Sequence, residues 1–194
     1  MNNPLRGLLQ EIVEIPRMKK IVDVPIHSKV LEIGCGVGRG IQLIQKQFLP
    51  SEVTGVDLDL KMIELANQQN YDGKVDLLVA DVTKLPFRDN SFDAIFNFGS
   101  IHHVPDWKKA IQQIVRVVKP GGLLVLEDLS VETFNSPLGK LARKFLVHPY
   151  SQMYEQNEFI QNLRKFGTEI LSKKTYTNLG LIRYFVVVAR KINN

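Results

Sequence analysis

Residues 30–40 read VLEIGCGVGRG, a short apolar run with one acid that breaks into glycines at every second position. An apolar run that ends in closely spaced glycines is typical of a strand that enters a tight loop and then a helix, as in an α/β sheet. Loops of this kind bind nucleotides and related ligands in more than one way. The ligand of this loop therefore decides most of what the sequence implies about function.

Short β-branched runs alternate with longer segments of helical period along the rest of the chain. The expected strands are 29–33, 52–56, 75–80, 92–98, 123–127, 169–177 and 184–189. Helices are expected over 4–22, 138–146 and 155–166. Three further helices are expected after the glycines, after Asp59 and after Asp106. Pro120-Gly121-Gly122 predicts a turn before the fifth strand. The pattern predicts an α/β fold, a doubly wound, seven-stranded, mostly parallel, Rossmann-like sheet with an antiparallel C-terminal strand.

Composition places the chain in an ordinary class. Its 194 residues, 44% of them hydrophobic and 23% charged, fit one domain over 1–194. No apolar run reaches the roughly 20 residues that cross a bilayer, and acids near the N-terminus argue against an export signal. Cys35 is the single cysteine, so a disulfide within the chain and a cysteine-based metal cage are excluded, and we expect a cytoplasmic protein with no metal.

The net charge of +5 has two readings. It can reflect a solvated, lysine-rich surface, or it can attract an anionic partner. The basic residues are scattered in small groups and form no dense block, so we do not expect nucleic acid as a partner.

The glycine spacing argues against a dinucleotide. That fingerprint is G-x-G-x-x-G, and its third glycine lets helix and strand pack closely. Gly34 and Gly36 fit the first two positions, but Arg39 occupies the third. The phosphate-binding pattern that ends in Lys-Ser or Lys-Thr is absent as well.

Five segments in order resemble the class I S-adenosylmethionine-dependent methyltransferases, and most closely their ubiquinone/menaquinone-biosynthesis (type 11) subgroup. They are residues 30–40, 53–57, 80–87, 92–104 and 118–122. The resemblance implies S-adenosyl-L-methionine as the cofactor and methyl transfer as the reaction.

The chemistry of the residues agrees with this cofactor. Asp57 follows Gly34 by 23 residues, close to the ~20-residue offset of an acid that accepts the ribose hydroxyls. Glu32 can face the ammonium group of the ligand, or it can be a strand acid paired with a lysine. The backbone of Gly34, Cys35 and Gly36 can approach the amino-acid part of the ligand closely, although packing alone also explains Cys35.

The adenine should lie farther along the chain. Asp81 can accept from its amino group or simply form a turn, while Leu58 and Val82 sandwich the ring. Met62 either covers the same pocket or belongs to the core. By resemblance, Asn97 contacts the methionine part of the cofactor.

His102 is the expected general base, because it follows the fourth strand, where the acceptor should bind, and imidazole titrates near neutrality. His103 is the second candidate, and the pair also occurs in the family as a feature at the entry to a helix. We expect substrate choice to lie in the N-terminal helical segment, 1–28, and in 129–151. The latter is either a lid, apolar with basic edges, or a surface helix.

The sequence therefore predicts a methyltransferase that acts on a small molecule, hydrophobic or anionic. The chain is short for the family, so the cleft is either open or completed by a second subunit in a homodimer. The alternatives are a non-catalytic cofactor-binding protein with a regulatory or scaffolding role, and a methyltransferase that acts on a macromolecule. A nicotinamide oxidoreductase is disfavoured by Arg39.

Overall fold

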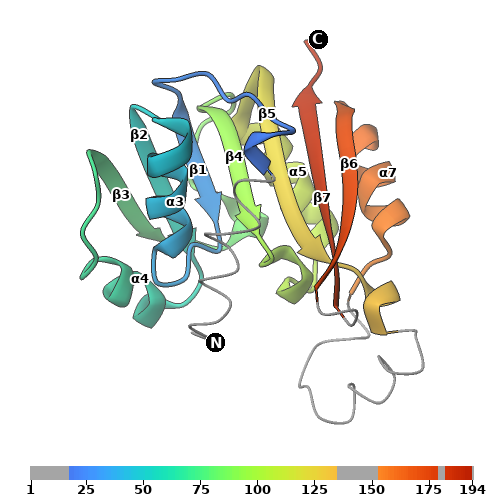
Figure 1. Ribbon diagram of the computed structural model, residues 1–194, viewed down its shortest axis with the longest axis horizontal. Helices are drawn as coiled ribbons and strands as arrows, with labels where there is room; N and C mark the ends of the chain where they lie inside the picture. The colour runs from blue at the N-terminus through green and yellow to red at the C-terminus, as the bar shows by residue number, and fades with distance from the viewer. Residues whose placement is uncertain (1–17, 135–152, 179–181, 194) are drawn as a thin grey trace.

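A seven-stranded sheet forms the centre of the computed structural model, which describes residues 18–134, 153–178 and 182–193. The strand order is β3-β2-β1-β4-β5-β7-β6 (Figure 1). The strands are β1 (Lys29–Ile33), β2 (Glu52–Asp57), β3 (Lys74–Val79), β4 (Phe92–Phe98), β5 (Val118–Leu129), β6 (Thr168–Asn178) and β7 (Ile182–Lys191). β7 is antiparallel to β5 and β6, whereas β1 to β5 pair in parallel. The predicted mostly parallel, Rossmann-like sheet is confirmed.

Helices cover both faces of this sheet (Figure 1). They are α3 (Arg39–Phe48), α4 (Leu60–Ala66), α5 (Trp107–Val117) and α7 (Gln156–Lys165), joined by the 3₁₀ turns η2 (Val82–Lys84), η3 (Ile101–His103) and η4 (Val131–Phe134). As the sequence predicts, Asp59 and Asp106 are the N-cap residues of α4 and α5. Their carboxylates accept the backbone N–H groups of Lys61 at 2.8 Å and Lys109 at 3.2 Å.

The apolar spacing of each helix explains which face it covers. Ile41, Ile44 and Phe48 recur at helical spacing on α3 and pack on one face of the sheet, where Phe48 lies 5.1 Å from Phe96 between ring centroids. On the other face, α5 and α7 enclose a larger core that contains Trp107. The central strands β1, β2, β4 and β5 are largely buried on both faces, as in parallel sheets generally, whereas β3 at the edge is mostly exposed.

The turn predicted at 120–122 is instead a bulge within β5. Phe92 pairs with Val118 and Ala94 with Leu123, so the four residues 119–122 lie opposite the single residue Asp93. Glycine is required at 122 because a Cβ there would lie 2.8 Å from the carbonyl oxygen of Asp93. The prediction of a break before the fifth strand is therefore wrong, since the chain continues in the same strand after a local kink.

Two sequence predictions fall largely outside the described residues. Of the helix expected over 4–22, the structure describes only the end, at Met18 and Lys19. Of the segment 129–151, the structure describes the end of β5 and η4, while the helix expected over 138–146 lies outside.

The carboxyl ends of β1, β2 and β4 lie at one edge of the sheet, at the bottom of Figure 1. In open α/β sheets this is the edge at which ligands bind, near the point where the strand order reverses. Here the order reverses between β1 and β4. Among the described residues, no helix is both long and apolar enough to cross a membrane.

Replacement of Phe96 by Ala should lower the free energy of unfolding by about 3–5 kcal/mol, because the ring is fully buried and its loss leaves a cavity between β4 and α3. Urea denaturation measures the change. Ile192→Ala is the control, since Ile192 is 48% exposed and its truncation should cost less than about 0.5 kcal/mol. Equal effects of the two variants would contradict this view of the core.

Candidate functional site

The loop between β1 and α3 carries the glycines, and they serve different purposes. Gly34 (φ +65°) lies against Ser100, because a Cβ on Gly34 would come within 2.3 Å of the Ser100 Cβ. Gly36 (φ +53°) has no atom within 4 Å of the position that its Cβ would take. Close packing within the protein therefore explains Gly34, while Gly36 presents its backbone to open space at the ligand-binding edge of the sheet.

Glu32 lies beneath this loop on β1 and is almost completely buried, with 2% of it exposed. Its carboxylate lies against α3 at Gly40, where a Cβ would come within 1.9 Å of the Glu32 Oε1. Gly40, one residue after Arg39, is thus the glycine that lets the helix pack on the strand. The expected packing role of a glycine is present, but it is shifted by one position from the dinucleotide fingerprint.

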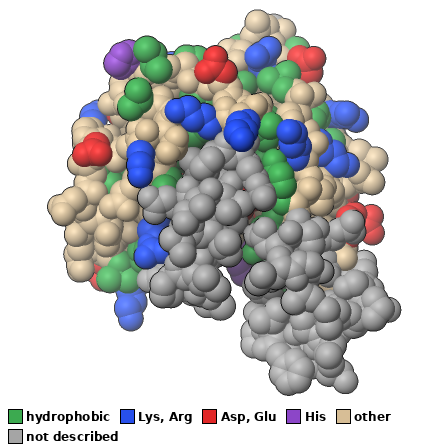
Figure 2. Space-filling model, in the orientation of Figure 1, with side chains coloured by type: hydrophobic (Ala, Val, Ile, Leu, Met, Phe, Trp, Pro, Cys, Tyr) green, Lys and Arg blue, Asp and Glu red, His purple; other side chains and the backbone are tan. Residues whose placement is uncertain are grey.

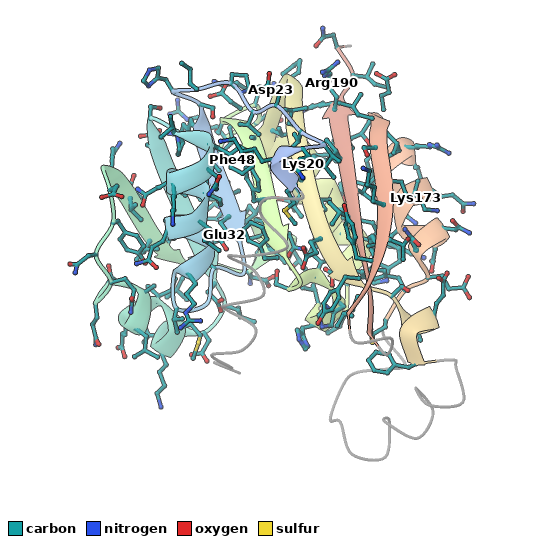
Figure 3. The ribbon with its side chains drawn as sticks, in the orientation of Figure 1. Lys20, Asp23, Glu32, Phe48, Lys173 and Arg190 are labelled. Carbon is teal, nitrogen blue, oxygen red and sulfur yellow. The ribbon has the colours of Figure 1, made fainter. Side chains whose placement is uncertain are left out.

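The carboxylate of Glu32 has no counter-charge among the described residues. Its Oε2 atom has no hydrogen-bond partner among the described residues, and Figure 3 shows the labelled cations Lys20, Lys173 and Arg190 well apart from it. Burial, together with the negative charge of Asp57, raises the pKa of Glu32 well above its ordinary value. The alternative that Glu32 pairs with a lysine finds no support among the described residues.

Asp57 joins the second strand to the glycine loop. Its Oδ2 accepts the Gly36 N–H at 2.9 Å, and its Oδ1 accepts the Asp59 N–H at 3.0 Å. Each carboxylate oxygen has two acceptor sites, so capacity remains for the hydroxyls of a ligand. Asp57 thus fixes the loop and places a second negative charge near Glu32.

The residues expected to enclose the adenine occupy different environments. Leu58 is 72% exposed beside the loop, Met62 is half-buried on α4, and Val82, the first residue of η2, is buried in the core. The Oδ1 of Asp81 accepts both the backbone N–H and the hydroxyl of Thr83 at 2.8 Å. Asp81 therefore caps η2, as a turn former does, while its Oδ2 lies 3.9 Å from the Lys84 ammonium.

The thiol of Cys35 is buried, and burial raises its pKa above its ordinary value. The Cys35 N–H donates to the carbonyl of Val56 at 3.0 Å, which ties the loop to β2. A protonated, buried thiol is a poor nucleophile, so the geometry favours a packing role.

A second buried polar cluster lies where β4 and β5 end. Asn97 donates from Nδ2 to the Asp128 Oδ2 at 3.1 Å and to the carbonyl of Glu127 at 2.7 Å. Asp128 also accepts the N–H groups of Ile101 at 3.0 Å and Leu129 at 2.7 Å, and its Oδ1 bonds the Nδ1 of His102.

Asp128 is ionised within this cluster. Burial alone would raise its pKa, but the charge of His102 and the hydrogen bonds from His102 and the Leu129 backbone together hold the pKa below its ordinary value. Burial and the charge of Asp128 raise the pKa of the nearby Tyr154 well above its usual range, so that phenol stays protonated. A carboxylate that accepts from Nδ1–H fixes the imidazole tautomer and leaves Nε2 as the basic nitrogen.

The two candidate histidines differ in exposure. Only 1% of His102 is exposed, whereas His103 is exposed and its ring lies against that of His102, with 4.0 Å between centroids. Asp128 was not among the residues predicted from the sequence. The available signal was its position, since two acids, Glu127 and Asp128, end the apolar run of the fifth strand.

The chain is similar to known methyltransferases. Residues 31–126 match the family described as "Methyltransferase domain". The phthiotriol/phenolphthiotriol dimycocerosates methyltransferase of Mycobacterium tuberculosis is 34% identical over 72% of this chain and 51% of its own length. The 27-O-demethylrifamycin SV methyltransferase of Amycolatopsis mediterranei is 36% identical over 79% of this chain and 58% of its own length.

The fold agrees with these sequence matches. A solved S-adenosylmethionine-dependent methyltransferase from Mesorhizobium loti superposes with a TM-score of 0.77 at 19% identity and covers 94% of this chain and 100% of its own. The chain belongs to the class I S-adenosylmethionine-dependent methyltransferase family. It spans about half the length of the curated relatives that it matches.

Replacement of Glu32 by Gln should change stability and cofactor binding in opposite directions. Because the pKa of Glu32 is raised in the folded state, folding takes up a proton at pH values between the ordinary pKa and the raised one. The stability of the cofactor-free protein should therefore fall as the pH rises through this range. Gln cannot ionise, so this fall should shrink and the melting temperature at pH 8 should rise by a few degrees. Calorimetry with S-adenosylmethionine should show weaker binding, because the negative charge is lost.

Glu52→Gln is the matched control, since Glu52 lies on β2 in ion pairs with Lys29 and Lys74 that lower its pKa. It should leave cofactor affinity unchanged. A Glu32→Gln protein with wild-type affinity would contradict the assignment of Glu32 to the cofactor site.

Proposed function

We propose that this protein transfers a methyl group from S-adenosylmethionine to a small organic acceptor. The observation that carries the proposal is the buried Glu32, which has no cation among the described residues and lies beneath a loop that opens at Gly36. A buried carboxylate without a counter-charge is costly, so its presence indicates a site for a positively charged ligand.

The residues of the loop fit this cofactor. When bound, S-adenosylmethionine supplies a methyl group on a sulfonium. Transfer of that methyl group leaves a neutral thioether, which needs no proton. Glu32 would hold the ammonium group and Asp57 the ribose hydroxyls, while the backbone around Gly34, Cys35 and Gly36 would approach the amino-acid part. Asn97 would contact the same part of the ligand by resemblance.

The adenine assignments are a further proposal. Leu58 and Met62 would cover the ring, with Val82 below it, and Asp81 would accept from the amino group through its Oδ2 atom. The exposure of Leu58 supports its role, since a large apolar side chain left in water gains from covering a ring.

His102 would take the proton of the acceptor at Nε2. Asp128 supports this role, because it bonds Nδ1 and stabilises the imidazolium that forms. Asn97 and the Ile101 N–H hold Asp128 in turn, so the dyad is fixed before the acceptor binds. A hydroxyl or an activated carbon needs such a base, whereas an amine that is already neutral does not.

The acceptor is best supported as a small molecule, because the names of both curated relatives specify an organic molecule. The apolar cluster of Leu129, Phe134 and Met153, at the end of β5, supports a hydrophobic part. The prediction of an anionic acceptor depends on basic residues between 135 and 152, outside the described residues, and stays a prediction. The homodimer likewise stays a prediction, and a scaffolding role is the alternative to turnover.

Asp57→Asn should weaken S-adenosylmethionine binding by about 10- to 100-fold, the effect of one charged hydrogen bond of about 1.5–3 kcal/mol. Isothermal titration calorimetry measures this change, and wild-type protein should also bind the demethylated product but not NAD. Asp76→Asn is the control, because Asp76 is an exposed acid on β3. NAD binding with an affinity equal to that of S-adenosylmethionine would refute the assignment.

His102→Ala should lower kcat by about 100-fold or more on the true acceptor, with cofactor affinity unchanged. Asp128→Asn should also lower kcat, because a neutral amide stabilises the imidazolium less than a carboxylate does. A metabolite panel identifies the acceptor, and product formation in it separates an enzyme from a scaffold. His103→Ala is the control and should retain turnover. A His102→Ala protein with full turnover would contradict the role of His102 as the base.

A further inference from the structure

A small cavity lies beyond the end of β5, outside the residues assigned above to cofactor and base. Its volume is about 120 Å³, and it is lined by Ser130, Glu132, Gln156, Thr175, Tyr184 and Phe185. Four elements contribute to the lining, namely η4, the first turn of α7, β6 and β7, and Ser130 joins β5 to η4. The cavity is thus formed by tertiary packing rather than by one loop.

Among the described residues that line the cavity, the only charge is negative. Glu132 is the only charged residue among the described residues that line the cavity, and it makes no ion pair with any other described residue. Ser130 is buried, with 4% of it exposed, and makes no side-chain hydrogen bond to another described residue. Gln156, also buried, donates from Nε2 to the Thr175 hydroxyl at 3.3 Å. The described residues of the wall are therefore rich in oxygen acceptors, and none of them is basic.

This chemistry selects a cation. An anion would be repelled by the carboxylate of Glu132, which forms no ion pair with another described residue, whereas an ammonium group can donate to it. On the face in Figure 2 basic side chains are spread among acidic and uncharged ones, whereas none of the described residues that line the cavity is basic.

The cavity is large enough for a polar group of a ligand. Its volume of about 120 Å³ is well above the ~10–15 Å³ that one water molecule needs. An ammonium nitrogen with one or two attached carbons fits that space.

Along the chain, the cavity lies close to Asp128, the partner of the proposed base His102. Ser130 follows Asp128 by two residues, and Asp128 bonds His102. The Val131 N–H donates to the carbonyl of Tyr154 at 3.0 Å, and the charge of Asp128 acts on the Tyr154 phenol. The cavity also adjoins Asp128 in space, because Phe185, which lines the cavity, pairs with Asp128 across β5 and β7.

We propose that this cavity is a subsite for an ammonium group of the methyl acceptor, remote from the atom that receives the methyl. The inference rests on the proposed function and narrows its substrate class to acceptors that carry a primary or secondary amine. Binding of a remote group of this kind positions the reacting atom without taking part in the chemistry.

The test is a titration of the full chain, labelled with nitrogen-15, with ethylammonium chloride, followed by two-dimensional amide NMR. Saturable shifts are expected at the backbone amides of Ser130, Glu132, Gln156 and Thr175. Glu132→Gln should weaken binding about tenfold or more. Glu158→Gln is the matched control, because Glu158 lies on α7 in an exposed pair with Lys108, and it should bind ethylammonium as the wild type does.

Potassium chloride at equal ionic strength and sodium propionate serve as the other probes. The proposal is overturned if ethylammonium causes no localised shifts, if Glu132→Gln binds it as well as wild type, or if potassium or propionate shifts the same amides equally. Since this readout needs neither cofactor nor turnover, loss of amine binding with intact S-adenosylmethionine binding rejects the subsite alone. Absent S-adenosylmethionine binding rejects the proposed function instead.

Discussion

Two carboxylates, Glu32 and Asp57, are held close together under one glycine loop, and neither pairs with a cation among the described residues. Their mutual repulsion and the burial of Glu32 work against folding, because each negative charge raises the free energy of ionising the other carboxyl group. The parallel pairing of β1 with β2 brings them together, since both strands end at the same edge. The proposed cofactor site thus depends on a repulsion that the sheet imposes.

This arrangement explains why the loop is so rich in glycine. Asp57 draws the Gly36 N–H onto its carboxylate, Gly34 lies against Ser100, and Gly40 makes room for Glu32. A side chain at position 40 would collide with the acid whose charge the ligand requires. The glycines are therefore placed by the needs of the protein as much as by those of the ligand, and of these three only Gly36 faces open space.

The sequence predicted the fold class, most element positions and the two helix N-caps, because apolar periodicity and capping residues are local signals. It failed at 119–122, since a Pro-Gly-Gly signal cannot reveal that Asp93 on a neighbouring strand holds this segment in the sheet through Lys119, at 2.6 Å. Asp128 was missed for a similar reason. Its hydrogen-bond partners come from β4, η3 and its own strand end, and only the fold brings them together.

Comparison of Glu32 with Asp128 shows how one chemical group can serve two purposes. Both are almost completely buried acids at the same edge of the sheet, yet the pKa of Glu32 is raised and that of Asp128 is lowered. The difference lies in their partners, because Asp128 has an imidazole and several N–H donors while Glu32 has an oxygen with none among the described residues. A satisfied carboxylate holds other groups in place, whereas an unsatisfied one is completed by a ligand. The distinction supports the proposed roles, positioning for Asp128 and binding for Glu32, which their burial and residue class alone do not separate.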